Sequence, residues 1–516
     1  MKRIYLFLIA LTLFSCKSVE KYNARRNTAI APEKLRKDVD FTYEKLQEFH
    51  PQLYWYISKE QLDFKFDSLK TTITQPLTPV EFYFKIQPVI SQIREGHLSV
   101  RMPAERYDRK GLKNFKNKTG LFGRMNYRLE NDRLFVVENK DSVQNIIPGT
   151  EILSINSEPV SKYVKRYSAL ITSDGKNQTF KNRYLSDAFF SLYLLDEGYK
   201  DSAQIQTSYN GQIQNLTLKR ETKTEAELAK EKEAQKSTAD KNTNDYEALT
   251  DTYNRTFKFI SSDSTAAYMK IKTFSRLFSK RFYQQSFEKL KKSKAEYLII
   301  DIRDNYGGSL AEINNLYSYL ASEPFTLIKP AKIVSKSTPF KTNFFTNTSA
   351  IGYVIKGILY PGILTAHLFS ARKDREGNAF YNTRENKVTQ PKPDAFHGKV
   401  YLLINGGSFS ASAIIAAKLK NDKRAILVGE ETGGANDGTV AGFYSYQKLP
   451  NSKLELPIGL LLVQPNINFQ NKDLGVKPDV EITETLEQVI KKEDPVLDYV
   501  KAEIEIIAEN KVGRRK

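Results

Sequence analysis

A serine that follows a buried strand is the first candidate for chemistry in this sequence. Val400 to Ile404 is an apolar run, and Ser410 opens the helical run that comes after it. A serine at such a turn lies beside a helix N-terminus, whose free amides and positive dipole end favour an oxyanion. The same position suits an ordinary N-cap serine. Taken alone, Ser410 therefore leaves both a nucleophile and a cap open.

Two further segments could serve such a serine. Asp301 to Gly308 also follows a buried strand and precedes a helix, and its paired glycines allow close backbone approach to a ligand with an amide left free. A nucleophilic serine also needs a base at neutral pH, and Gly96-His97 offers an imidazole.

Histidine-dependent chemistry has few candidates, because the chain holds four histidines. We interpret His50, which precedes a helix-stopping proline, His367 and His397 as structural or exposed residues. No His, Asp and Glu spacing predicts a metal site, so no metal and no cofactor are expected.

Together these segments resemble the carboxy-terminal processing (tail-specific) peptidase family, which also includes the tricorn core protease and the retinoid-binding protein of the eye. Gly429 to Gly434 and Gly475 to Asp479 match further family segments in the expected order. The resemblance implies an α/β fold: a crotonase-like catalytic core with an N-terminal helical part and an inserted PDZ-like β-rich domain. It also implies a serine-type peptidase that acts on proteins or peptides.

The base cannot be assigned by simple transfer from the bacterial processing branch. That branch uses a lysine 25 residues after the serine, and this position is Ala435. Lys418 and Lys420 lie eight and ten residues along the same helix as Ser410, about 12–15 Å away at a rise of 1.5 Å per residue. Neither lysine is a simple replacement.

The tricorn-like branch uses a histidine in an Asp-Gly-His turn, and Glu95-Gly96-His97 matches that turn with Glu for Asp. The resemblance therefore implies that His97 is the base. It also places a carboxylate just before Gly475, where Lys472 occupies the expected position and Asp473 is the best candidate.

The resemblance further implies that the amides of Gly308 and Ala411 form the oxyanion hole. Ala435 stands at the lysine position and Asp473 lies one residue after the expected acidic position. These two departures keep a second function open, that of a catalytically inactive protein that binds peptides or ligands on the same scaffold.

The surrounding segments divide the chain into six parts. We expect a helical region at 16–115, a PDZ-like domain at 118–222, a charged linker at 223–254, a catalytic domain at 255–490 and a C-terminal helix or tail at 491–516, after a signal peptide at 1–15. Within the PDZ-like part, Pro148 to Asn156 matches a family strand, and Gly120 to Gly123 lies near the place of a carboxylate-binding loop. The insertion 331–395 shows no assignable pattern.

The single cysteine lies at the end of an N-terminal apolar run. Ile4 to Phe14 is about eleven residues long, too short for a bilayer of ~30 Å, and follows the basic start Lys2-Arg3. Leu13 to Cys16 resembles a bacterial lipobox, so we expect lipidation at Cys16, although an ordinary signal peptide with an incidental cysteine has a similar pattern. A lipid-anchored protein of the bacterial cell envelope, periplasmic or associated with the outer membrane, is predicted.

The basic charge of the chain does not indicate nucleic-acid binding. The formal net charge is +19, but the basic residues are spread through the 516-residue sequence without a long block. We interpret them as solvated surface, and predict protein substrates and a membrane anchor as partners.

Overall fold

The computed structural model describes residues 19–139, 146–229, 246–247, 252–275, 279–342, 350–468 and 473–513. The expected signal peptide and Cys16 lie outside these residues. Within them, no helix is both long and apolar enough to cross a bilayer.

The N-terminal part is helical, as its periodicity predicts. Its helices are α2 (Pro32–Phe49), α3 (Lys59–Thr71), α4 (Pro79–Ser91) and α5 (Arg109–Lys116). The predicted capping box is present at the start of α4, where Thr78 Oγ1 accepts from the Glu81 amide and the Glu81 side chain accepts from the Thr78 amide. The chain leaves α4 into the loop that carries His97.

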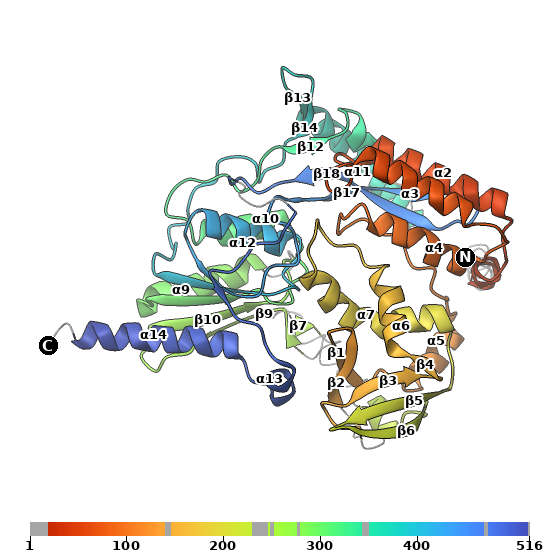
Figure 1. Ribbon diagram of the computed structural model, residues 1–516. Coiled ribbons are helices and arrows are strands. Elements are labelled where there is room, and N and C mark those ends of the chain that lie inside the picture. The colour runs from red at the N-terminus through yellow and green to blue at the C-terminus, as the bar shows by residue number, and fades with distance from the viewer. Residues whose placement is uncertain are drawn as a thin grey trace, which may run out of the picture.

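A β-rich domain follows, inserted between the helical part and the catalytic core (Figure 1). Its strands are β1 (Met125–Glu130), β2 (Arg133–Asn139), β3 (Glu151–Ile155), β4 (Glu158–Pro159), β5 (Ser202–Tyr209) and β6 (Gln212–Lys219). They pair in the order β1-β2-β3-β5-β6, with β4 beside β3. Helices α6 (Val160–Ser168) and α7 (Thr179–Glu197) pack together, and α7 also packs on β1. This is the β-rich part that the sequence analysis expected to be PDZ-like, and the strand predicted after Pro148 is β3.

The catalytic core is a sheet with helices on both faces. Its strands are β9 (Arg255–Phe259), β10 (Ala266–Ile271), β11 (Tyr297–Asp301), β15 (Lys399–Ile404), β16 (Ile426–Gly429) and β19 (Val480–Glu481). They lie in the order β19-β16-β15-β11-β10-β9, all parallel except β9. One face is covered by α9 (Ser279–Ser293), α10 (Leu310–Ser318) and α12 (Ala411–Asn421), and the other by α14 (Pro495–Gly513), which follows α13 (Leu486–Lys491).

The insertion that the sequence left unassigned joins a second sheet. It contains β12 (Ala331–Ile333), the 3-10 helix η3 (Thr338–Lys341), α11 (Ala350–Ser370), β13 (Ala371–Lys373) and β14 (Ala379–Tyr381). These strands extend the hairpin of β17 (Thr439–Lys448) and β18 (Glu455–Val463) in the order β13-β14-β12-β18-β17. A further two-stranded pair, β7 (Tyr246–Glu247) and β8 (Thr252–Tyr253), falls within the expected linker.

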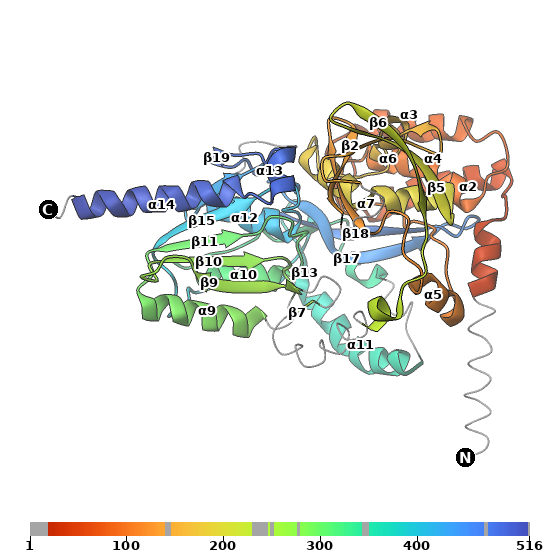
Figure 2. The ribbon, with the colours of Figure 1, turned by 90° about the horizontal axis from the view of Figure 1, so that it is seen from below.

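The β17–β18 hairpin ties the core to the N-terminal helices (Figure 2). The Asp38 carboxylate of α2 accepts from the amides of Asn451 and Ser452 at 2.9 and 2.7 Å, and the Arg101 amide donates to the Glu455 carbonyl at 2.9 Å. The start of β17 and the loop after α4 are thereby fixed relative to each other, which positions the site described below.

Candidate active site

The two predicted strand-to-helix turns meet at one edge of the core sheet. β11 and β15 are parallel neighbours, with Asp301 opposite Leu403, so the loops that follow them emerge together. Hydrogen bonds join these loops: Ser412 Oγ donates to the Asn305 carbonyl at 2.7 Å, and the Phe409 amide donates to the same carbonyl at 3.1 Å. Ser410 therefore lies on a rigid turn.

Ser410 has a strained backbone at the start of α12. Its φ of 57° and ψ of −119° lie where few residues other than glycine are found. Gly307 and Gly434 pack so closely against Ser410 that neither position could carry a side chain. A Cβ on Gly307 would lie 2.7 Å from Ser410 Cβ, and one on Gly434 would lie 3.0 Å from the Ser410 amide nitrogen. Such strain is retained when the surroundings enforce it, and it is common at reactive residues.

His97 lies against Ser410, although 313 residues separate them in sequence. His97 Nε2 is 3.0 Å from Ser410 Oγ, the distance of a hydrogen bond. The imidazole stacks on the Phe409 ring with centroids 4.8 Å apart, and 17% of its side chain is exposed. The structure therefore brings the predicted serine and the predicted base together.

The other ring nitrogen of His97 faces Thr439, the first residue of β17. Thr439 Oγ1 is 2.8 Å from His97 Nδ1 and donates to Glu95 Oε1 at 2.9 Å. Because the hydroxyl proton points to the carboxylate, the threonine oxygen is left to accept from Nδ1–H. That tautomer leaves Nε2 free to accept from the Ser410 hydroxyl.

The sequence predicted neither Thr439 as a site residue nor its hydrogen bond to Glu95. Glu95 entered only as a substitute in a family turn, and no local pattern marks Thr439, which is 342 residues from His97. The Glu95 carboxylate is buried, accepts from the Val440 amide at 3.0 Å and lies 3.7 Å from His97 Nδ1.

A second buried carboxylate, Asp174, adjoins this group from the loop before α7. Its oxygens accept from the Gly96 amide at 2.6 Å and the Ala435 amide at 3.3 Å. Burial, together with the negative charge of Glu95, raises the pKa of Asp174 to about 7. Ala435, at the place of the family's lysine, has only a methyl side chain, so its backbone amide is what it contributes to this group.

The two carboxylates set the electrostatics of the imidazole. Burial acts to lower the pKa of His97, but Glu95 and Asp174 outweigh burial and leave this pKa above its usual value. Burial likewise acts to raise the pKa of Glu95, whereas the adjacent His97 and His50 rings and the Val440 amide hold it below the usual range. At neutral pH Glu95 is therefore ionised, whereas Asp174, with a pKa of about 7, is partly ionised.

The donors expected to bind an oxyanion lie beside Ser410. Within the described part of the chain, the amides of Gly308 and Ala411 have no hydrogen-bond partner. The neighbouring Gly307 and Ser309 amides are engaged, by Asn305 Oδ1 at 2.9 Å and the Phe274 carbonyl at 2.7 Å. The contacts of Phe274 hold the Asp301–Gly308 segment, here called the glycine loop, in place and leave the Gly308 amide unpaired.

Asp473 does not join this group. Its carboxylate lies 3.5 Å from Lys176 Nζ, its carbonyl accepts from the Lys176 amide at 2.7 Å, and no contact with His97 is present. The structure therefore does not place the expected third residue beside the imidazole. Glu95 is the carboxylate near His97 Nδ1, and the Thr439 hydroxyl joins the two.

The lysines that the sequence disfavoured are engaged elsewhere. Lys418 Nζ contacts Asp422 at 3.0 Å and the Asn466 carbonyl, and Lys420 Nζ pairs with Asp479 at 2.9 Å. His50 is buried with a pKa lowered to about 4 by burial. His367 contacts the Tyr381 hydroxyl in the insertion.

Among the described residues, one set of side chains has donors suited to a metal ion. A donor atom from each of Glu95, His97 and Asp174 lies within 4.8 Å of the others. These atoms already take part in hydrogen bonds with Thr439 and with the amides of Gly96 and Ala435. The arrangement is that of a hydrogen-bonded network around an imidazole.

Comparisons with known proteins agree with this reading of the core. Residues 265–482 match the sequence model of peptidase family S41, while no curated protein sequence matches the chain. The solved structure of mature CPAF is similar, with 16% identity, a TM-score of 0.60, and coverage of 91% of this chain and 96% of CPAF. CPAF complexed with lactacystin gives a TM-score of 0.61 and coverage of 93% and 98%.

The photosystem II D1 C-terminal processing protease is a more distant structural neighbour, with 13% identity, a TM-score of 0.40, and coverage of 89% of this chain and 96% of that protein. The match identifies residues 265–482 as a serine-type peptidase domain of family S41, within a fold that the chain shares with CPAF along almost its whole length.

Proposed function

We propose that the protein cleaves peptide bonds by a serine–histidine mechanism and that it works as a lipid-anchored processing endopeptidase of the bacterial cell envelope. The observation that carries the mechanism is the 3.0 Å contact between Ser410 Oγ and His97 Nε2, with the opposite ring nitrogen held by Thr439. The anchor is inferred from Cys16 at the end of an apolar run.

In the first half of the reaction, Ser410 Oγ attacks the scissile carbonyl carbon as its proton passes to His97 Nε2. The carbonyl electrons move to oxygen, and the amides of Gly308 and Ala411 bind the resulting oxyanion. The carbon–nitrogen bond then breaks, and the proton on Nε2 passes to the leaving amine. The product of this half is an acyl ester on Ser410.

In the second half, water replaces the amine. His97 Nε2 takes a proton from the water, whose oxygen attacks the ester carbonyl, and the same proton returns to Ser410 Oγ as the acid product leaves. Throughout, Glu95 stabilises the imidazolium through Thr439. Glu95 and Thr439 act on the ring and not on the substrate, so they are positioning residues.

A fluorophosphonate probe tests this assignment directly, because it reacts only with an activated serine. The native protein should be labelled and the Ser410→Ala variant should not. Lys418→Ala is the matched control, since that lysine pairs with Asp422, and it should be labelled like the native protein. Lactacystin, which is bound in a solved structure of CPAF, should compete with the probe.

A native protein that binds peptide but takes no label would support the alternative, an inactive binding protein on the same scaffold. The intact contact between Ser410 and His97 favours the enzyme.

A further inference from the structure

Helix α11 exposes an unusual amount of apolar surface. Its 21 residues, Ala350–Ser370, include one charged side chain, Lys356. Five apolar side chains are exposed by the following fractions: Ile355 53%, Ile358 74%, Leu359 55%, Leu368 61% and Phe369 69%. Among the described side chains of the helix, His367 is the buried one. A helix of this composition is normally covered by another apolar surface.

Helix α5 combines basic charge with exposed apolar groups. It carries four exposed cations, Arg109, Lys110, Lys113 and Lys116, and within the structure as described none of them has an ion-pair partner. The helix also exposes 43% of Leu112 and 36% of Phe115. A short basic amphipathic helix of this kind favours the interface between water and anionic lipid.

These two helices lie on the same side of the molecule as the start of the described chain. In Figure 2, α11, α5 and the first described residues lie toward the lower edge, and β6 lies toward the upper edge. The described chain starts at residue 19, three residues after Cys16, and three residues span at most about 11 Å. A lipid on Cys16 would therefore hold this side of the protein close to a bilayer.

We propose that the face formed by α11 and α5, here called the basal face, docks on an anionic lipid bilayer. The apolar side chains of α11 enter the boundary between headgroups and acyl chains, and the cations of α5 contact phosphate groups. A bilayer fits this face better than a second copy of the chain does, because the face joins unpaired cations to apolar groups beside the expected anchor. The orientation rests on the proposed lipid anchor.

The test uses tryptophan fluorescence in the full-length protein. Trp55, the single tryptophan, is replaced by Phe, and one isoleucine is replaced by Trp, as Ile358→Trp or Ile213→Trp. The two isoleucines form a matched pair, because 74% of Ile358 and 62% of Ile213 is exposed, but Ile213 belongs to β6 on the opposite side. Each protein is reconstituted in vesicles of phosphatidylethanolamine and phosphatidylglycerol with brominated acyl chains.

Bromine quenches tryptophan only at short range, so we expect quenching of the I358W variant at least about three-fold stronger than that of I213W. Equal quenching in both variants, or none in I358W, would overturn the proposal. An I358W variant that is unquenched and forms a dimer would assign the basal face to a second copy. Mass spectrometry of Cys16 on the same sample reports the lipid, so failure of the anchor is distinguished from failure of the docking.

Discussion

Ser410 and His97 should act as one unit, because the proton that leaves the serine is the proton that the imidazole carries. Ser410→Ala and His97→Ala should each lower turnover by about 10⁴-fold or more, and the double variant should be little worse than either. Single-turnover kinetics with a fluorogenic peptide measures all three. Multiplicative losses in the double variant would contradict a shared step, and a His97→Ala enzyme with near-normal turnover would remove the histidine from the mechanism.

Glu95 should determine the pH at which His97 becomes a base. Its negative charge raises the pKa of His97, so Glu95→Gln should lower that pKa, and the acidic limb of kcat/KM should move to lower pH. Turnover at the plateau should fall by less than the ~10²–10⁴-fold expected for loss of the base itself. An unchanged acidic limb with a reduced plateau would point to a structural role only.

Thr439 should matter through its hydroxyl group, which joins Glu95 to the ring. Thr439→Val keeps the shape of the side chain but removes both hydrogen bonds, so kcat should fall about 10-fold or more with little change in KM. Thr439→Ser is the control and should restore most of the activity. If the valine and serine variants behave alike, the hydroxyl has no part in holding the imidazole.

Asp174 should make the folded protein less stable at higher pH. Its pKa of about 7 in the folded state exceeds the ~3.9 of an unfolded aspartate, so the native state holds the proton more tightly. The resulting loss of stability is absent below pH ~4, grows between pH ~4 and ~7, and is complete above it. Thermal unfolding should show Asp174→Asn gaining melting temperature relative to the native protein across that window, whereas a constant difference would disprove the linkage.

At the scale of elements, the sequence predicted those parts of the site that local patterns encode. Ser410 and the glycine loop could be found because each follows a buried strand, and parallel neighbouring strands bring such loops together. Thr439 could not, because its place beside His97 depends on the β17–β18 hairpin, which is fixed by long-range contacts such as that of Asp38 with Ser452. Asp473 was placed by family position alone, and its local contacts with Lys176 hold it away from the ring.

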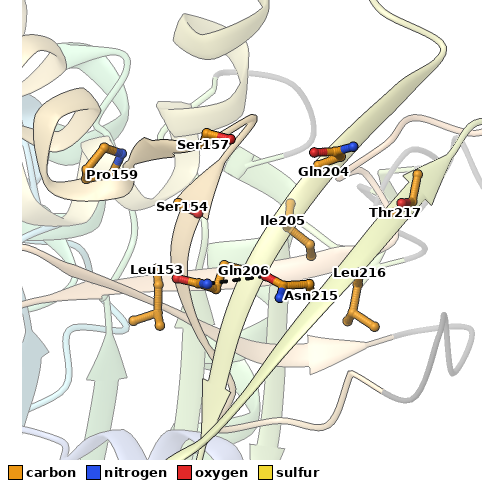
Figure 3. A pocket seen from close by; sticks show the side chains of 10 residues that line it. All are labelled: Leu153, Ser154, Ser157, Pro159, Gln204, Ile205, Gln206, Asn215, Leu216 and Thr217. Carbon is orange, nitrogen blue, oxygen red and sulfur yellow. Dashed lines mark hydrogen bonds between the residues drawn. The ribbon is translucent and has the colours of Figure 1, made fainter.

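The β-rich domain has a cavity of its own, away from Ser410. A cavity of about 540 Å³ lies over β3, β5 and β6 and has a largely polar lining, with Gln206 Nε2 donating to Asn215 Oδ1 at 3.2 Å (Figure 3). In the loop at Gly120–Gly123 both glycines are exposed, but the side chain of Phe122 is buried. The Tyr127 hydroxyl donates to the Phe122 carbonyl at 3.0 Å, and the Phe122 and Phe190 rings stack with centroids 3.9 Å apart.

Because the Phe190 ring stacks on Phe122 and fills the apolar side of this loop, we expect a free peptide carboxylate to contribute little to binding. We expect amidation of a substrate's C-terminus to change KM by less than about three-fold, within the range of one weak hydrogen bond. Paired peptides that differ only in this group measure it, with the Ser410→Ala protein used for direct binding. A loss of ten-fold or more on amidation would show that the loop captures carboxyl ends as in PDZ domains.

At the scale of the whole molecule, the proposed anchor and the proposed basal face predict two levels of membrane attachment. Cys16→Ser should abolish incorporation of a labelled fatty acid, and Ser15→Ala, which keeps the cysteine, should retain it. Without the lipid, the cations of α5 and the apolar side chains of α11 still favour the bilayer, but salt screens the charges at close range. The C16S variant should therefore sediment partly with membranes at low salt and be released at high salt, while the native protein stays bound in both. A C16S variant that keeps the fatty-acid label would contradict the anchor, and one that is fully soluble at low salt would contradict the basal face.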